Sequence, residues 1–174
     1  MWNSYFRENF LVLLIGIVGD THNNLVNISK ICQLFNSKKV NLVIHTGDIS
    51  LPKALYAFKE LNCKMIGVFG NNDQGDKEAL VETSKELNFE FFNGPHFLKV
   101  ENIVFSIIHD PLDIDEEMMS KSNVIFHGHT HRFRCEKIKN VLIFNPGECA
   151  GFMKNKNQIG IFDTEKNTPR ILSF

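Results

Sequence analysis

The fold is decided by the stretch Leu11-Val12-Leu13-Leu14-Ile15-Gly16-Ile17-Val18, which runs directly into Gly19-Asp20-Thr21-His22. An unbroken run of apolar residues and glycine predicts a buried strand. The chain continues with apolar residues at helical spacing over residues 24–38 and with a second apolar run over residues 42–45. A strand, a helix and a strand in this order predict a βαβ unit.

This alternation continues through the first half of the chain. We expect helices over residues 52–61 and 77–87, a third strand over residues 64–69 and a loop over residues 70–76. The second half has one short helix candidate, residues 113–121, and a series of short strand candidates: residues 89–92, 96–100, 103–109, 124–126, 141–144, 160–162 and 170–172. Two βαβ units followed by mostly antiparallel strands predict an α/β fold with two stacked sheets and helices outside.

Length and composition limit what this fold can do. The chain has 174 residues, of which 43% are hydrophobic, so we expect a single domain over residues 1–174 with a buried core. A net charge of −1, without a dense block of Lys and Arg, argues against a large surface for duplex nucleic acid. Four cysteines lie far apart and form no Cys-x-x-Cys motif, which favours reduced thiols in a cytoplasmic protein.

The N-terminal residues have two interpretations. Residues 10–18 follow Arg7 and resemble the apolar region of a signal peptide. They are too few to span a bilayer, and no small-residue cleavage site precedes Gly19. We therefore expect a buried strand, a flexible polar extension over residues 1–9 and no membrane association.

Side chains that can bind metal follow five of the predicted strands. They are Asp20 and His22 after the first strand, Asp48 after the second, Asn71 after the third, His109 at the end of a later strand, and His129 and His131 after residues 124–126. In an open α/β sheet, ligands gather where strands end. Carboxylates, imidazoles and an amide, without cysteine, favour Mn²⁺, Fe²⁺, Zn²⁺, Ni²⁺ or Co²⁺. Seven candidates exceed the needs of one ion, so we expect two ions sharing a carboxylate, which is the arrangement that hydrolyses phosphate esters.

Five motifs carry these residues in a fixed order: Gly19-Asp20-Thr21-His22, Gly47-Asp48, Gly70-Asn71-Asn72-Asp73, His109 and Gly128-His129-Thr130-His131. In order and spacing they resemble the calcineurin-like metallophosphoesterases. With the short chain and the Asn145-Pro146-Gly147 turn, they are similar to the small archaeal and bacterial phosphodiesterases of the YfcE type. The resemblance covers residues 15 to about 151. It implies a four-layer αββα sandwich of two mixed β-sheets flanked by helices, and a metal-dependent phosphodiesterase that acts on a small phosphodiester.

The resemblance also assigns roles to the motif residues. One metal would be held by Asp20, His22, Asp48 and His131, and the other by Asp48, Asn71, His109 and His129, so that Asp48 bridges them. A hydroxide between the ions would attack phosphorus in line. Asn71, together with the metals, would stabilise charge on the phosphoryl oxygens. We expect two divalent ions per chain, Mn²⁺ first, with Ni²⁺, Fe²⁺, Zn²⁺ or Co²⁺ as alternatives. The oligomeric state stays open, a homo-oligomer included.

Three positions depart from the family's pattern. Asn72 stands where many larger members have a histidine that protonates the leaving group, and an amide cannot supply that proton. We therefore count Asn72 with Asn71 and His109 as catalytic and expect a preference for good leaving groups, or a proton from water. Asp110 replaces a usual glycine, and two roles stay open for it: orienting His109 or lying in an exposed turn. Glu148 replaces a more common small residue, and we assign it no role.

Other polar and aromatic residues near the motifs have simpler interpretations. We expect His45 to be a hydrogen-bonded core histidine, with a supporting role behind the metals as the alternative. His127 is expected to be structural, because seven ligands already fill the site. Asp73 is expected to fix the loop that presents the motif asparagine. Phe133 or Phe152 is a candidate wall of the substrate cleft.

Three rival functions stay open. A phosphomonoesterase or nucleotidase would use the same metals on another bond class. The retromer subunit with this fold is a protein-binding scaffold with little activity, although the intact ligand set argues against that reading. A nuclease is disfavoured by the near-neutral charge and by the lack of an appended DNA-binding domain.

Overall fold

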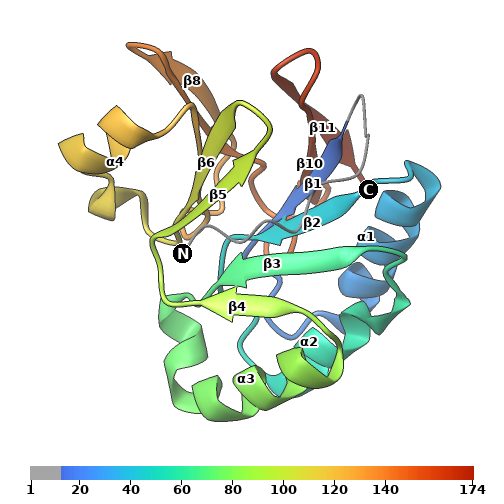
Figure 1. Ribbon diagram of the computed structural model, residues 1–174. Coiled ribbons are helices and arrows are strands. Elements are labelled where there is room, and N and C mark those ends of the chain that lie inside the picture. The colour runs from blue at the N-terminus through green and yellow to red at the C-terminus, as the bar shows by residue number, and fades with distance from the viewer. Residues whose placement is uncertain (1–12) are drawn as a thin grey trace.

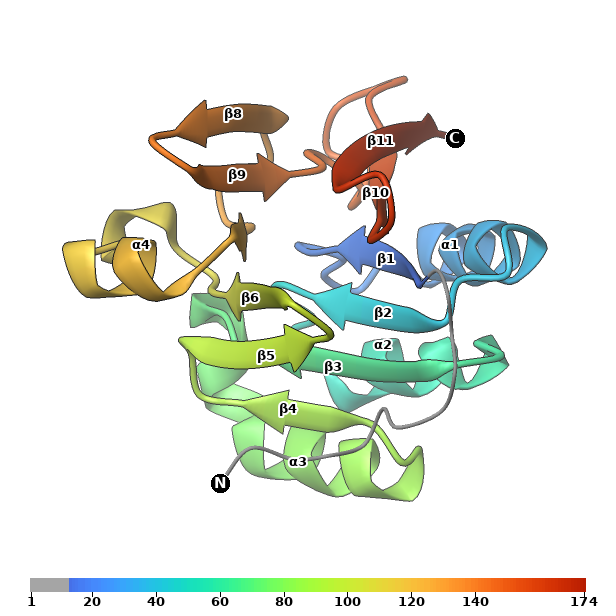
Figure 2. The same cartoon turned by 45° about the horizontal axis from the view of Figure 1, so that its top comes forward.

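Two β-sheets form the centre of the molecule in the computed structural model, which describes residues 13–174. The first sheet contains, in spatial order, β11 (Thr168–Ser173), β10 (Gln158–Asp163), β1 (Leu14–Val18), β2 (Leu42–His45), β3 (Lys64–Val68) and β4 (Glu90–Phe92). The second contains β5 (His96–Val100), β6 (Ile103–Ile107), β7 (Val124–Phe126), β9 (Val141–Asn145) and β8 (Arg134–Ile138). Both views show the two sheets facing each other (Figures 1 and 2).

Parallel pairing in both sheets brings the carboxyl ends of several strands together. In the first sheet, β1, β2, β3 and β4 pair in parallel, and the arrowheads of β2, β3 and β4 point the same way in Figure 1. In the second sheet, β6, β7 and β9 are parallel, and only the edge strands β5 and β8 are antiparallel. The expectation of mostly antiparallel strands in the second half is therefore wrong for the middle of this sheet.

Local sequence explains where the helices begin. Helix α1 (Leu25–Ser37) starts at Asn24, whose side chain accepts a hydrogen bond of 3.0 Å from the backbone N–H of Asn27. Helix α2 (Pro52–Ala57) has proline in its first turn, where no N–H is needed, and continues as a 3₁₀ turn over Phe58–Glu60. Helix α3 (Lys77–Glu86) and helix α4 (Glu116–Lys121) complete the set.

Three apolar clusters separate four layers. The cluster between the sheets includes the fully buried rings of Phe105, Phe126 and Phe162. A second cluster joins α1, α2 and α3 to the first sheet, and a smaller one joins Met118 of α4 to the second sheet. Figure 1 shows α4 on the opposite side of the molecule from α1 and α3. Burial of each large side chain contributes about 1.5–3 kcal/mol to stability. The order of helices and sheets confirms the predicted αββα sandwich of two mixed sheets.

Several boundaries differ from the sequence-based expectation. The predicted loop over residues 70–76 is a 3₁₀ helix, Asn71–Asp76. Strand β8 was not predicted, because it is an edge strand whose last four residues are exposed and lack an apolar face. Residues 11 and 12 of the predicted first strand, and the predicted extension over residues 1–9, lie outside the described residues. Within the described part of the chain, no helix has the length and apolar character needed to cross a membrane.

Candidate metal centre

All seven predicted ligands meet at the carboxyl edge of the parallel strands. Backbone hydrogen bonds connect the loops that carry them: the N–H of Asp20 donates to the carbonyl of Gly47 at 2.8 Å, and that of His22 donates to Asp48 at 2.9 Å. In the second sheet, the loops after β6 and β7 are linked by a 3.0 Å hydrogen bond from the Gly128 N–H to the carbonyl of His109. The two sheets are connected by the backbone N–H of His129, which donates to the Asp20 carboxylate at 2.9 Å. The fold therefore brings side chains together from segments that are far apart in the sequence.

The first half of the centre consists of Asp20, His22 and His131. One donor atom from each lies within 4.8 Å of the others. The Nε2 atoms of His22 and His131 are 3.3 Å apart, and Nε2 of His131 lies 3.9 Å from Oδ1 of Asp20. The two imidazole rings stack with an interplanar angle of 7°. Their nitrogens thus face one common point beside the buried carboxylate.

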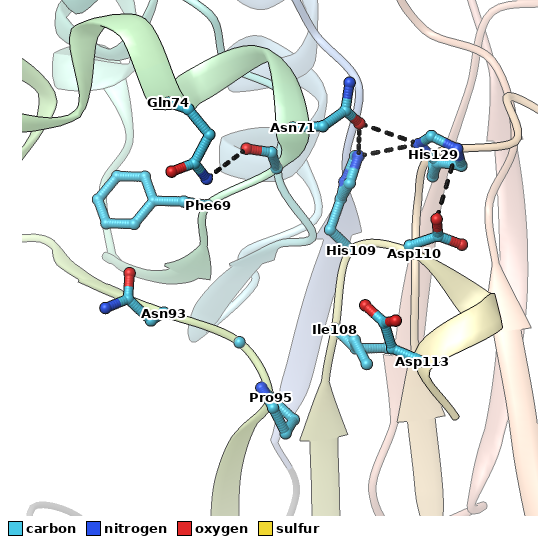
Figure 3. A pocket seen from close by; sticks show the side chains of 12 residues that line it. Phe69, Asn71, Gln74, Asn93, Pro95, Ile108, His109, Asp110, Asp113 and His129 are labelled. Atoms are coloured by element: carbon cyan, nitrogen blue, oxygen red, sulfur yellow. Dashed lines mark hydrogen bonds and ion pairs between the residues drawn. The ribbon is translucent and has the colours of Figure 1, made fainter. Parts of the chain in front are cut away.

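The second half consists of Asn71, His109 and His129. Nε2 of His109 lies 2.9 Å from Oδ1 of Asn71 and 3.2 Å from Nδ1 of His129, and the asparagine and His129 atoms are 3.1 Å apart. Figure 3 shows this triangle of atoms at the edge of a pocket. Three atoms that can each bind a cation therefore converge here.

Asp48 lies between the two halves. Its Oδ1 is 3.4 Å from Nε2 of His109, and a carboxylate oxygen of Asp48 also groups with Asp20 and His109 within 4.8 Å. Asn72 donates two hydrogen bonds to Asp48, from its backbone N–H at 2.9 Å and from its side-chain amide at 2.6 Å. The carboxylate is thereby held where both halves can use it.

The hydrogen-bond partners of His109 favour a cation at this centre. Nδ1 of His109 donates to the carbonyl oxygen of Thr46 at 2.9 Å, because a carbonyl only accepts. In a neutral His109 ring, Nε2 then has no proton and carries a lone pair. This lone pair faces the side-chain oxygen of Asn71, which is also an acceptor. Two acceptors at this distance repel each other unless a cation lies between them. The donor set of carboxylates, imidazoles and an amide suits divalent ions.

Titration behaviour supports the same conclusion. The pKa of the Asp20 carboxyl is raised from 3.8 to about 7, chiefly by burial; the charge of His131 opposes this rise and that of Asp48 adds to it. Burial also lowers the pKa of His22, so its ring is neutral and able to bind metal near pH 7. The centre holds carboxylates close together, so a bound cation would reduce the repulsion between them.

Five of the seven ligands have left-handed backbone, with φ of 53° at Asp20, 45° at His22, 60° at Asp48, 66° at His129 and 52° at His131. This region is uncommon for residues other than glycine and often marks functional sites. Neighbouring glycines leave room for the ligands: a Cβ at Gly70 would lie 2.1 Å from Oδ1 of Asp48, and one at Gly128 would lie 2.7 Å from Oδ2 of Asp20. The loops are therefore shaped around the ligand carboxylates.

Asp73 and His45 hold the loops that carry the candidate ligands. The buried Asp73 carboxylate accepts three backbone hydrogen bonds of 2.7–2.9 Å, from Asp48, Ser50 and Gly70, which confirms that it fixes the asparagine loop. Nε2 of His45 bonds to the Thr21 hydroxyl at 3.0 Å, and its Nδ1 accepts from the N–H of Gly47 at 3.1 Å. His45 is fully buried, and the prediction of a hydrogen-bonded core histidine is confirmed.

The loop after β7 is held by its own polar contacts. His127 is buried and faces the carbonyl of Gly128 at 3.0 Å, in agreement with a structural role. The Asn145 amide donates to the same carbonyl at 3.0 Å and to the Thr130 hydroxyl at 3.2 Å. Thr130 thus contacts Asn145 and takes no part in the cluster of ligand atoms.

The structure decides between the two roles left open for Asp110, in favour of a turn residue, and gives contacts for Glu148. The Asp110 side chain lies 3.7 Å from Nε2 of His129 and caps the turn that follows, with Oδ1 accepting from Leu112 at 2.9 Å. The hypothesis that it orients His109 is wrong, because the Thr46 carbonyl holds that ring. Glu148, to which we assigned no role, is buried and hydrogen-bonded to Nδ1 of His131. An acidic residue directly after a Pro-Gly turn at the end of an apolar strand was the available signal.

Aromatic and polar surfaces flank the two halves differently. Phe152 is 70% exposed, and its ring centroid lies 5.2 Å from that of His22 and 5.5 Å from that of His131. Phe133, the other candidate wall, contacts Phe144. Beside the second half lies a pocket of about 370 Å³. Its lining includes Phe69, Gln74, Asn93, Pro95, Asp110 and Asp113 together with the three second-half residues (Figure 3).

Known proteins are similar to this chain in sequence and in fold. The phosphodiesterase MJ0936 of Methanocaldococcus jannaschii is 38% identical over 160 residues, which are 90% of this chain and 96% of that protein. The solved structure of an archaeal phosphodiesterase has a TM-score of 0.82 and 34% identity, covering 93% of this chain and 100% of its own. YfcE, a phosphoesterase from E. coli, has a TM-score of 0.69 at 19% identity over 92% of this chain and 99% of its own, which shows the shared fold.

A family model supplies the remaining comparison. The model for the calcineurin-like phosphoesterase superfamily domain matches residues 13–167, a span that contains every ligand of the two halves. This agrees with the converging carboxylates and imidazoles and with the relatives of similar length. The chain belongs to the calcineurin-like phosphoesterase superfamily.

Proposed function

We propose that the protein is a phosphodiesterase that works with two divalent ions, Mn²⁺ first. The observation that carries this proposal is the position of the Asp48 carboxylate, which lies within 4.8 Å of donor atoms of both Asp20 in the first half and His109 in the second. Asp20, His22 and His131 would hold one ion with Asp48, and Asn71, His109 and His129 would hold the other. The similarity to a curated phosphodiesterase over most of both chains supports the reaction class.

The chemistry that two such ions supply when bound is a lower pKa for the attacking water and positive charge opposite the phosphoryl oxygens. The protein's own residues position these groups. Asn71 lies between the centre and the pocket, where its amide contributes to binding a phosphoryl oxygen. The Asn72 amide is occupied by Asp48 and has no acidic proton, so the leaving group must depart as a stable anion or take a proton from water.

The pocket supports a diester over a monoester. Its volume of about 370 Å³ is enough for one alcohol group of a small diester. Among the described residues that line it, none is lysine or arginine, and Asp110 and Asp113 are acidic. A second phosphate, or the extra negative charge of a monoester, would meet no lysine or arginine in this lining, and the nearby Lys77 Nζ lies over the Phe69 ring, 5.4 Å from its centroid. An uncharged alcohol group would pack between Phe69 and Pro95.

The test combines composition with kinetics. Protein purified without chelators is analysed for metals, and activity is then compared on bis(p-nitrophenyl) phosphate and p-nitrophenyl phosphate over a series of divalent ions. We expect close to two ions per chain and faster turnover of the diester at saturating Mn²⁺. Preferred hydrolysis of the monoester would favour a phosphomonoesterase. Tight metal binding without hydrolysis of any diester in a panel would favour a protein-binding scaffold.

We also place the protein in the cytoplasm. The four cysteines, Cys32, Cys63, Cys135 and Cys149, are all free thiols. Burial raises the pKa of Cys32 to about 12 and that of Cys63 to about 11, which keeps both protonated and unreactive. Such a set agrees with a reducing compartment.

A further inference from the structure

Glu148 is placed with little freedom behind the first half of the centre. It follows β9 directly after the Asn145-Pro146-Gly147 turn, in which Oδ1 of Asn145 accepts from the Gly147 N–H at 2.8 Å. The backbone carbonyl of Glu148 accepts from Gln158 at 2.6 Å, which ties the residue to the start of β10. The residue is only 2% exposed, so its carboxylate is directed into the protein.

Both carboxylate oxygens of Glu148 have partners. Oε2 is hydrogen-bonded to Nδ1 of His131, and Oε1 accepts from the backbone N–H of Phe152 at 2.9 Å. A buried carboxylate is costly unless its oxygens accept hydrogen bonds, and these two bonds meet that need. The acceptor oxygen requires that the proton of a neutral His131 ring lie on Nδ1.

This bond decides which nitrogen of His131 can bind metal. With the proton on Nδ1, Nε2 carries the lone pair, and Nε2 is the atom that faces His22 and Asp20. The corresponding bond in the second half, from His109 to the Thr46 carbonyl, goes to a neutral acceptor. A carboxylate acceptor makes the imidazole more basic than a carbonyl does, and therefore a stronger ligand.

We propose that Glu148 is a positioning residue that fixes the His131 tautomer and thereby sets the cation affinity of the first half. The inference rests on the proposed function in one respect, the assignment of His131 as a ligand. Glutamine cannot replace Glu148 here. The single oxygen of its amide could accept from either His131 or Phe152. Its NH₂ group would then face the other donor, with which it cannot form a hydrogen bond.

The test uses Glu148→Gln, which preserves shape, and Glu82→Gln as a control, because Glu82 is exposed on α3. In the metal-free protein, ¹⁵N-detected histidine NMR reports the tautomer of each ring. Titration calorimetry with Mn²⁺ reports affinity and the number of ions bound. We expect the parent and Glu82→Gln to carry the His131 proton on Nδ1. In Glu148→Gln we expect a mixed or Nε2–H tautomer and one of the two Mn²⁺ affinities lowered about 10- to 100-fold, with the other within twofold.

An unchanged tautomer together with two unchanged Mn²⁺ affinities in Glu148→Gln would overturn the inference. If that variant fails to fold, Glu148→Met is used instead, since its side chain has a similar length but no oxygen that could accept from His131, and the same readouts apply. The outcome is separate from that of the proposed function. A parent that binds Mn²⁺ but hydrolyses no diester would refute the function, while the tautomer and affinity changes would still support the role of Glu148.

Discussion

The two halves of the centre differ in charge and in access. In the first half, Asp20 is fully buried, His131 is bonded to a buried carboxylate, and the Phe152 ring lies against both histidines. In the second half, His129 is exposed, His109 is bonded to a neutral carbonyl, and the ligands border a pocket. Under the proposed function, this difference assigns retention of a cation to the first half and access of the substrate to the second.

The largest effect is expected at the residue that both halves share. Asp48→Ala removes the common carboxylate, so both ions lose a ligand, and the rate of diester hydrolysis should fall at least about a thousandfold, the equivalent of ~4 kcal/mol. His109→Ala alters only the second half, so one tightly bound ion should remain while activity is lost. Metal analysis with rate measurements checks both variants. A near-normal rate with two bound ions in either would refute the ligand assignment.

A smaller effect confined to one half is expected from Gly128→Ala. The new Cβ would lie 2.7 Å from both Oδ2 of Asp20 and Oγ1 of Thr46 in a buried loop. We expect a loss of about 1–3 kcal/mol in the free energy of unfolding and weaker binding of the first ion. The matched control is Gly75→Ala, because a Cβ at Gly75 meets nothing within 4 Å. Equal stability of the two variants in denaturant unfolding would contradict the crowding described for the first half.

Asn72→His tests whether the substrate side of the centre lacks a proton donor for the leaving group. A histidine here could give a proton to the leaving group, which the amide of Asn72 cannot do. We expect the ratio of activity on an alkyl diester to that on an aryl diester to rise about tenfold, well below the effect of losing a ligand. The two rates are measured at the same Mn²⁺ concentration. A ratio that does not rise would show that leaving-group protonation is not what Asn72 limits.

An effect that is confined to acidic pH is expected from His45, which contacts Thr21 and the backbone of Gly47. Burial lowers the pKa of His45 from 6.5 to about 3, so between these values the unfolded chain binds a proton that the folded protein does not. The metal-free parent should therefore lose stability as pH falls from 6.5, by about 2 kcal/mol at pH 5 from this residue. Asp20, whose pKa is raised to about 7, acts in the opposite direction.

His45→Gln isolates the contribution of this histidine. Unfolding in denaturant with EDTA is measured at pH 8 and pH 5 for parent and variant, and Asp20 contributes equally to both proteins. The variant should be less stable at pH 8, because a flexible amide does not fill the fully buried site of the imidazole ring, but should lose less stability on acidification. Equal losses in the two proteins would show that His45 titrates normally.

The sequence predicted best what depends on local pattern. Strands β2, β5 and β7 have the predicted bounds, because each is a short run limited by polar or turn residues. The convergence of the candidate ligands followed from polar residues at strand ends. Strand β8 was missed because an edge strand needs no apolar face, and its pairing with β9 is a tertiary contact.

Contacts between segments could not be predicted in the same way. The Asp110 carboxylate follows His109 in sequence yet faces His129, because the chain turns at Pro111. Glu148 acts on His131 across 17 residues, and nothing in the local pattern specifies that distance. Both cases depend on how the loops after β6, β7 and β9 meet, which only the folded chain determines.

The left-handed backbone at five ligands has an evolutionary consequence. Each such residue costs about 1–2 kcal/mol relative to a relaxed conformation, and glycine at the same position would relieve most of that cost. Selection for folding alone would therefore remove these side chains early. Directed evolution of the metal-free protein for heat resistance, without a demand for hydrolysis, should lose Asp20, His22, Asp48, His129 or His131 before it alters the buried core. Under the proposed function, the binding of cations is what would keep these strained residues in the chain.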